Sequence, residues 1–430
     1  MNRCDTNKND SIKVLIVNGS LIGDDSATGT SMKNMLFGIN NVTYRQICTD
    51  YRVYAHESSI CNTLFVDERD TPFVFFIKRL IKRKDNSTSS VEKNPVILSK
   101  WDAKYWFFTL ISLLPIHISS RVKQFAKEFK PDLIYTMGGN PKTLRFSIEL
   151  QKILGCPIVF HCMDDWPSTA YDHVGFKLLR NWYLSLFNRL LEKTIVNLAI
   201  SNKMASAYHS RYNKRFVVAS NCSVVPSYVA PKEDGIIRLV YSGGVHSGRD
   251  NSLGLIAKAL KNNEDNIPVK LDIFLPHKDV DRMKDRIGSK DSFDNTNTAI
   301  YPYIDKDKQL ENLRNADVLL HVESFDETSK KYFALSFSTK LAEYMAAGRP
   351  IIVFGPKELA SVQLIEENDI GWVIENEDDI CTTIQIIYQN PNLVLSKGLK
   401  AYNLAKEFYA QDKVQERIYS VFNTINGKSV

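Results

Sequence analysis

Between residues 337 and 356 the sequence runs FSTKLAEYMAAGRPIIVFGP, which predicts a helix, a sharp stop and a buried strand. Ser338 is suited to cap the helix, because its hydroxyl can accept a hydrogen bond from an otherwise unpaired backbone N–H. Gly348 is placed to end the helix in a left-handed conformation, and a proline follows closely. The apolar run Ile351–Phe354 then suits a central strand of a parallel sheet.

Glu343 is the polar residue of interest on this predicted helix. A wheel of 3.6 residues per turn places Leu341, Tyr344 and Met345 on one side and Glu343 roughly opposite. The alanines beside Glu343 leave room for a ligand. The simpler interpretation is a solvated charge that pairs with Lys340, and both interpretations stay open.

This segment resembles the nucleotide-binding segment of GT-B glycosyltransferases, especially the retaining family 4 type of bacterial polysaccharide synthesis. The resemblance implies that Glu343 holds the ribose hydroxyls of a nucleotide-sugar and that Lys340 supports its phosphates. Many members carry another Glu eight positions earlier, where this chain has Leu335, so it departs from the family at the reacting end of the sugar. The matching positions are Ser338, Lys340, Glu343, Tyr344, Met345, Ala346, Gly348 and Pro350.

Composition places the chain among ordinary globular proteins of two or three domains, with 430 residues, 44% of them hydrophobic and 24% charged. The net charge of +6 is compatible with anionic lipids or phosphorylated substrates. No run resembles a zinc finger or a bZIP basic region, so nucleic acid is not predicted as a partner.

Cysteine usage and hydropathy favour a cytoplasmic chain. The seven cysteines are odd in number and include no C-x-x-C pair, which favours free thiols in a reducing compartment. The N-terminal residues are polar, unlike a secretory signal, and no apolar run reaches the roughly 20 residues that span a bilayer. We therefore expect a cytoplasmic protein that is at most peripheral on the inner face of the plasma membrane.

The first strand is predicted at residues 13–17, KVLIV, and a loop with scattered glycines follows it. These glycines lack the G-x-G-x-x-G spacing of a dinucleotide site. A helix is expected to start near Thr30 or Ser31. Gly29 and Thr30 at its N-terminus predict an acceptor or phosphate loop, and the alternative is a plain turn between strand and helix.

Two basic segments suggest contact with a membrane surface. Residues 77–84 contain five Lys or Arg, and residues 101–130 combine many aromatic residues with a basic end. Basic side chains beside exposed apolar surface suit an interfacial contact. The alternative is a core helix followed by a solvated amphipathic helix.

The segment 156–167, CPIVFHCMDDWP, predicts a strand and its exit loop. Ligands of parallel sheets bind beyond the carboxyl ends of strands, where His161, Asp164 and Asp165 are expected. The resemblance implies a catalytic role for these residues, and either Asp could orient or deprotonate an acceptor hydroxyl. For His161 the alternative is a hydrogen-bonded core residue. No second cluster at ligand spacing appears, so no metal site is predicted.

The second half repeats the pattern with a glycine loop between a strand and a helix at residues 237–252. Backbone N–H groups, a helix N-terminus and a guanidinium together suit a pyrophosphate. In the resembling enzymes this loop matches Gly243 and Arg249, and the cation neutralises the departing nucleoside diphosphate. Gly244 and His246 lie in the same loop. The alternative is a plain loop with a surface Arg.

Two further candidate residues lie at the ends of predicted strands. Tyr303 follows a predicted strand at the place where the resembling fold receives the base, so it is a candidate for stacking on that base. Glu323, at the end of another predicted strand, is a candidate to replace the family Glu whose position Leu335 occupies in this chain.

We therefore predict an α/β protein with two facing Rossmann-like domains, at 12–225 and 236–408, an interdomain cleft, and a last segment 409–430 that packs back on the first domain. The predicted activity transfers a sugar from a nucleotide-sugar to a glycan or lipid-linked acceptor and needs neither a cofactor nor a metal. The expected setting is capsule, O-antigen or related polysaccharide synthesis. The alternatives are a nucleotide-sugar 2-epimerase and a catalytically silent scaffold that binds glycan.

Overall fold

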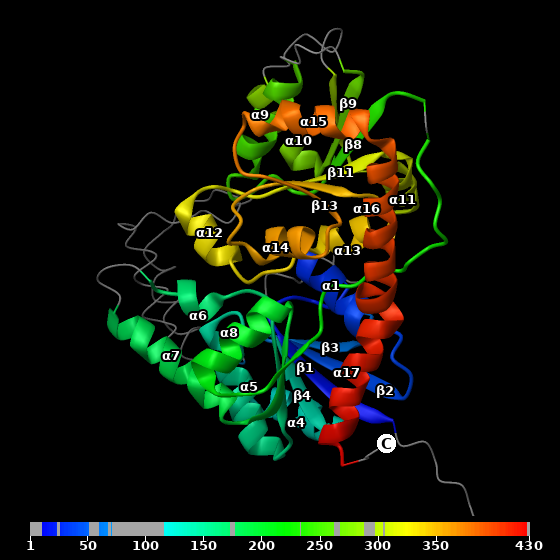
Figure 1. Cartoon of the computed structure of the whole chain (residues 1–430). Coiled ribbons are helices and arrows are strands. Elements are labelled where there is room, and N and C mark those ends of the chain that lie inside the picture. Colours follow the sequence, from blue (N-terminus) through cyan, green and yellow to red (C-terminus); the bar gives the residue numbers. More distant parts are fainter. Residues whose placement is uncertain are drawn as a thin grey trace, which may run out of the picture.

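The computed structural model describes residues 11–23, 26–50, 60–67, 70, 116–172, 177–232, 234–261, 267–287, 297–303 and 306–427. Two α/β domains are stacked on each other, the first at the bottom of Figure 1 and the second at the top. The strand pairings in both sheets are parallel. The predicted fold class, two parallel-sheet α/β domains, is therefore confirmed.

The first sheet has the strand order β3-β2-β1-β4-β5-β6-β7. Its central strands are almost continuously apolar and buried, as expected where helices cover both faces of a parallel sheet. The strands are β1 (Ile12–Asn18), β2 (Val42–Cys48), β3 (Asn62–Phe65), β4 (Leu133–Thr136), β5 (Ile158–Cys162), β6 (Thr194–Ala199) and β7 (Phe216–Val218).

Helices cover both faces of this sheet. One face packs on α4, α5, α7 and α8, and the other packs on α1 and on α17 from the far end of the chain. The helices are α1 (Ala27–Leu36), α4 (Ser120–Phe129), α5 (Pro141–Leu154), α6 (Trp166–Thr169), α7 (Lys177–Leu191), α8 (Asn202–Tyr212) and α17 (Gln411–Ile425).

The second sheet has the order β10-β9-β8-β11-β12-β13. One face packs on α9, α10 and α15 at the top of Figure 1, and the other packs on α13 and α14, on the side of the first domain. The strands are β8 (Ile237–Ser242), β9 (Val269–Leu275), β10 (Thr298–Pro302), β11 (Val318–Val322), β12 (Ile351–Phe354) and β13 (Gly371–Ile374). The helices are α9 (Arg249–Lys261), α10 (His277–Ile287), α11 (Lys306–Asn315), α12 (Glu327–Phe333), α13 (Thr339–Ala346), α14 (Ala360–Glu367), α15 (Asp379–Gln389) and α16 (Pro391–Leu404).

The chain crosses between the domains twice, and the two crossings touch. After α16 a short π-helix, η3 (Ala405–Tyr409), leads into α17. The N–H of Ser223, in the other crossing, donates to the carbonyl of Tyr409 at 3.0 Å, and the N–H of Gln411 donates to the carbonyl of Ser223 at 3.0 Å. Beyond this point α17 runs down the first domain (Figure 1), where Ile418 and Phe422 are buried.

The helix signals of the segment 337–356 are confirmed. The Ser338 hydroxyl accepts from the N–H of Lys340 at the start of α13, and Gly348 has a φ of 72° just after its end. The start predicted for the first helix is wrong. Helix α1 begins at Ala27, because Ser26 caps it and accepts from the N–H of Gly29 at 3.0 Å.

The segments proposed for membrane contact are only partly described. Residues 77–84 and 101–115 lie outside the described part of the chain. In the remainder, α4 buries Phe129, and the Arg45 guanidinium lies over the Phe125 and Phe129 rings at 5.2 and 5.1 Å. These aromatic side chains therefore pack within the protein. Among the described residues, every helix is too short or too polar to cross a bilayer.

Candidate functional site

The candidate site lies at the carboxyl ends of β8 and β11, where parallel sheets place ligands. Helix α13 is fixed there by Tyr344, whose hydroxyl accepts from the N–H of Ser242 at 2.8 Å and donates to the Ser242 carbonyl at 3.1 Å. Helix α13 is thereby held beside the end of β8. Two helix N-termini, those of α9 and α13, thus belong to this region of the second domain.

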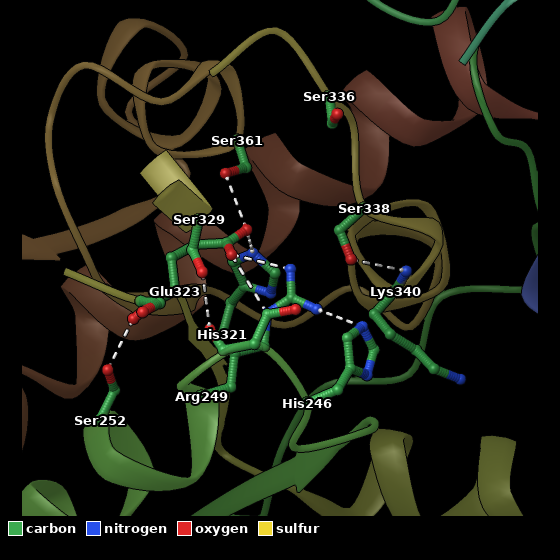
Figure 2. A network of polar contacts seen from close by, with 12 residues as sticks. His246, Arg249, Ser252, His321, Glu323, Ser329, Ser336, Ser338, Lys340 and Ser361 are labelled. Atoms are coloured by element: carbon green, nitrogen blue, oxygen red, sulfur yellow. Dashed lines mark hydrogen bonds and ion pairs between the residues drawn. The ribbon is translucent and has the colours of Figure 1, made fainter. Parts of the chain in front are cut away.

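Arg249 is the central cation of the site (Figure 2). It is the first residue of α9. Its Nη2 and Nε donate to one carboxylate oxygen of Glu323 at 2.8 and 3.1 Å. Its guanidinium lies 4.8 Å from the centre of the Phe333 ring. With 13% of its side chain exposed, Arg249 is a partly buried cation rather than a plain surface Arg.

Glu323 follows β11 and is almost fully buried. Its second oxygen, Oε1, accepts from His321 Nε2 at 3.0 Å and from the Ser361 hydroxyl at 3.2 Å. Burial raises the pKa of this carboxyl, but Arg249 and His321 outweigh burial and lower the pKa to about 2. Glu323 is therefore ionised at neutral pH and forms a charge pair with Arg249.

The glycine loop between β8 and α9 is tightly packed. A Cβ at Gly243 would lie 2.8 Å from the Tyr241 hydroxyl, and one at Gly244 would lie 3.0 Å from His246 Nδ1. Gly248 has a φ of 83°, which favours glycine, and a Cβ there would lie 2.5 Å from the Ser324 hydroxyl. These three glycine positions therefore leave little room for a side chain. His246 lies in the same loop, with Nε2 3.5 Å from Arg249 Nη1.

Lys340, Glu343 and Tyr303 form a second polar group. Lys340 Nζ donates to Glu343 Oε2 at 3.0 Å, which is the pairing that the simpler interpretation of Glu343 predicts. The Glu343 side chain is nevertheless 33% exposed, so it remains accessible to a ligand. Lys340 Nζ also lies 5.7 Å from the centre of the Tyr303 ring. The structure thus brings together the three residues expected to meet the ribose, the phosphates and the base.

Asp164 of the first domain faces this region across the domain boundary. Its carboxylate accepts from the Ser336 hydroxyl at 2.8 Å. Burial raises the pKa of Asp164, while hydrogen bonds from Ser336 and Tyr332 and the charge of Arg249 act in the opposite direction. Of the three residues predicted to be catalytic, Asp164 is thus the one that lies near Arg249.

The other two predicted acceptor-side residues have their polar atoms engaged within the protein. Asp165 is buried and accepts from the Tyr208 hydroxyl at 2.9 Å and from Arg211 Nη1 at 2.8 Å. His161 is fully buried, and its two ring nitrogens bond to the Tyr135 hydroxyl at 2.6 Å and to the Ala219 carbonyl at 2.9 Å. These contacts favour the alternative of a hydrogen-bonded core histidine.

The predicted loop at Gly29 and Thr30 is part of a helix. The N–H of Gly29 donates to the Ser26 hydroxyl, and that of Thr30 donates to the Ser26 carbonyl at 2.9 Å. Both N–H groups are therefore used by the helix itself. The structure favours the alternative here, an ordinary turn between a strand and a helix.

Sequence reasoning missed the residues that join the two domains at the site. The Ser201 hydroxyl donates to the Leu335 carbonyl at 2.7 Å, and Asn221 Nδ2 donates to the Phe337 carbonyl at 2.8 Å. Serine and asparagine in loops carry no specific signal, so only the fold could identify these contacts. The Leu335 side chain itself is 5% exposed and packs in the core.

Comparison with known sequences gives a match to part of the chain. The family described as "Glucosyltransferase 3-like, C-terminal domain" matches residues 291–402, which include α13 and β12. Glucosyltransferase 3 of Streptococcus parasanguinis is 28% identical over 96 residues, which are 22% of this chain. The chain spans 28% of the length of that curated relative.

Comparison with solved structures covers nearly the whole chain. HepE of Anabaena, solved in complex with UDP, has a TM-score of 0.63 at 13% identity over 96% of this chain and 100% of that one. A glycosyltransferase from Rickettsia africae has a TM-score of 0.62 at 14% identity over 98% and 100%. Sucrose-phosphate synthase from Thermosynechococcus elongatus has a TM-score of 0.61 at 11% identity over 97% and 100%. The fold is therefore that of GT-B glycosyltransferases.

Proposed function

We propose that the chain is a glycosyltransferase that moves a sugar from a nucleotide-sugar to an acceptor hydroxyl. The observation that carries this proposal is the convergence of Arg249, Lys340 and two helix N-termini in the second domain, facing Asp164 of the first. Cations and helix N-termini suit a departing diphosphate. A carboxylate on the opposite side suits an acceptor hydroxyl that must lose a proton.

Each group of the site has a role in this proposal. Arg249 and the first turns of α9 and α13 bind the diphosphate, and Lys340 adds charge on the same side. Glu343 accepts hydrogen bonds from the ribose, and Tyr303 lies against the base. Asp164 orients the acceptor and receives its proton. Because the cations supply the charge that the leaving diphosphate needs, we propose that the reaction needs no metal ion and no cofactor.

A uridine nucleotide is the first donor to test. HepE, whose fold this chain shares, has been solved with UDP and with UDP-glucose, and the matching relative is named Glucosyltransferase 3. We propose a UDP-linked hexose as donor, retention at the anomeric carbon, and a glycan or lipid-linked acceptor. The setting would be cell-surface polysaccharide synthesis, with the protein at the inner face of the plasma membrane.

The test is thermal unfolding with UDP, GDP, ADP, TDP and CMP. A nucleotide at 100 times its dissociation constant stabilises the folded state by about 2.7 kcal/mol, so UDP should raise the melting temperature of the wild type. Arg249→Ala and Glu343→Ala should lose this response. Asp164→Asn should keep it and lose transfer, because Asp164 acts on the acceptor.

Four outcomes contradict parts of this proposal. If no nucleotide stabilises the wild type, the donor site is wrong. If both variants respond as the wild type does, the site lies elsewhere. Nucleotide binding with no turnover on any acceptor would favour the silent scaffold, and epimer formation without acceptor would favour the 2-epimerase.

A further inference from the structure

The carboxylate of Glu323 lies at the meeting point of four elements around Arg249 (Figure 2). It receives Arg249 from α9, His321 from β11 and Ser361 from α14. A Cβ at Gly355, after β12, would lie 2.8 Å from the Glu323 Cβ, so a glycine there makes room for it. Buried carboxylates persist where they are paired and fully hydrogen-bonded, as this one is.

The two oxygens of Glu323 are held by different groups. Oε1 accepts hydrogen bonds from His321 and Ser361, and these two bonds fix the plane of the carboxylate. Within the described part of the chain, Oε2 accepts only from Arg249, at 2.8 Å from Nη2 and 3.1 Å from Nε. The carboxylate is thus an anchored acceptor for one edge of the guanidinium.

The contact with Glu323 determines the orientation of the Arg249 guanidinium. Glu323 holds the edge formed by Nε and Nη2, and the Phe333 ring lies 4.8 Å from the guanidinium carbon. Nη1 lies outside the pair, 3.5 Å from His246 Nε2 at the glycine loop. A planar guanidinium that is held along one edge directs its remaining N–H groups in fixed directions.

We propose that Glu323 is a positioning residue that fixes the guanidinium of Arg249 so that Nη1 faces the diphosphate of the donor. This inference rests on the proposed function and names a further residue of the same site. It also replaces the expectation that Glu323 substitutes for a sugar-binding Glu, because both of its oxygens bond to other protein groups.

The test is calorimetric titration of UDP and of uridine into the wild type, Arg249→Ala, Glu323→Gln and the double variant. Uridine lacks the diphosphate and so reports on the base and ribose contacts alone. Glu323→Gln keeps the shape of the side chain and removes its charge. The control is Glu366→Gln, the same change at an exposed position of α14.

Glu323→Gln should weaken UDP binding by about tenfold or more, as Arg249→Ala does, and leave uridine binding unchanged. In the Arg249→Ala background the same change should alter the UDP dissociation constant by less than about twofold, because Glu323 acts through Arg249. If Glu323→Gln does not fold, Glu323→Asp serves instead, since it keeps the charge and withdraws the carboxylate by one methylene.

The outcomes separate this inference from the proposed function. If the wild type and Arg249→Ala differ but Glu323→Gln binds UDP as the wild type does, the positioning role is wrong and the donor site stands. Equal losses for UDP and uridine would show a general structural role and overturn the inference. If the wild type binds neither UDP nor any other nucleoside diphosphate, both are overturned.

Discussion

The imidazole of His161 illustrates how burial decides what a residue does. A carbonyl only accepts hydrogen bonds, so the ring nitrogen Nε2 beside Ala219 carries the proton and Nδ1 accepts from Tyr135. Burial lowers the pKa of His161 to about 4, although the Ala219 carbonyl acts to raise it. The neutral ring therefore belongs to the folded state near neutral pH.

This shift predicts a pH dependence of stability. Below its ordinary pKa near 6.5 the unfolded chain protonates His161, while the folded chain does not until about pH 4. Stability is therefore complete above pH 6.5, falls as the pH drops through the unfolded value, and stops falling below about 4. Between pH 7 and pH 5 the loss should be about 2 kcal/mol.

Urea unfolding of the wild type and of His161→Gln at pH 5, 6 and 7 measures this loss. Other groups titrate in both proteins, so the difference between the two pH profiles isolates His161. The wild type should lose more stability than His161→Gln on acidification. Parallel profiles would show that His161 is protonated as easily in the folded state as in the unfolded one.

At the scale of an element, both ends of α13 follow from local chemistry. Ser338 caps the start, and Gly348 reverses the chain after the end, which could be predicted from residue type and spacing alone. The neighbour of Gly348 could not be predicted in this way. A Cβ there would lie 2.9 Å from the ring of Tyr228, in the crossing between the domains.

Gly348→Ala should therefore cost more stability than an alanine at an open left-handed site. The matched control is Gly155, which caps α5 with a φ of 73° and has no atom within 4 Å of an added Cβ. Gly155→Ala should cost about 1 to 2 kcal/mol from backbone strain alone. Gly348→Ala should cost about 1 to 3 kcal/mol more, from the displaced Tyr228 ring.

Chemical unfolding of the two variants provides the comparison. Equal losses would mean that the Tyr228 ring moves aside freely, and that the packing of the crossing on α13 contributes nothing. A larger loss for Gly348→Ala would show that packing of the crossing segment against the end of α13 stabilises the protein.

At the scale of the whole molecule, the two parallel sheets were predictable from the sequence, and so was the placement of Lys340 and Glu343 on one helix. Strands and helices could be predicted because apolar runs, glycines and capping residues specify them from nearby positions. The spacing of Lys340 and Glu343 places both on one helix. The bond between Ser336 and Asp164 joins residues 172 positions apart, and no local pattern encodes it. The burial of His161 and Asp165 likewise depends on neighbours from other elements.

The loop before α13 is bonded to the first domain. Three successive positions of this loop bond to the first domain: the Leu335 carbonyl accepts from Ser201, the Ser336 hydroxyl donates to Asp164, and the Phe337 carbonyl accepts from Asn221. A cluster of buried apolar side chains from both domains also includes Leu335 and Phe337. The start of α13 is therefore held from both domains.

The double variant Ser201→Ala/Asn221→Ala should weaken UDP binding although neither residue is proposed to touch the nucleotide. Without these bonds the loop occupies its binding arrangement for a smaller fraction of the time, and the apparent dissociation constant rises in inverse proportion. We expect a rise of about three- to tenfold for UDP and a smaller one for uridine, since the loop precedes the helix N-terminus proposed to meet the diphosphate.

Calorimetric titration at a temperature where both proteins are folded measures this effect. The control is Ser210→Ala, an exposed serine of α8 whose hydroxyl donates within its own helix to the Ser206 carbonyl at 3.0 Å. An unchanged UDP dissociation constant in the double variant would show that the second domain alone sets the donor site. A selective loss for UDP would show that the first domain, which carries the Asp164 proposed to act on the acceptor, also holds the loop proposed to receive the donor. The two substrates would then depend on one arrangement of the domains.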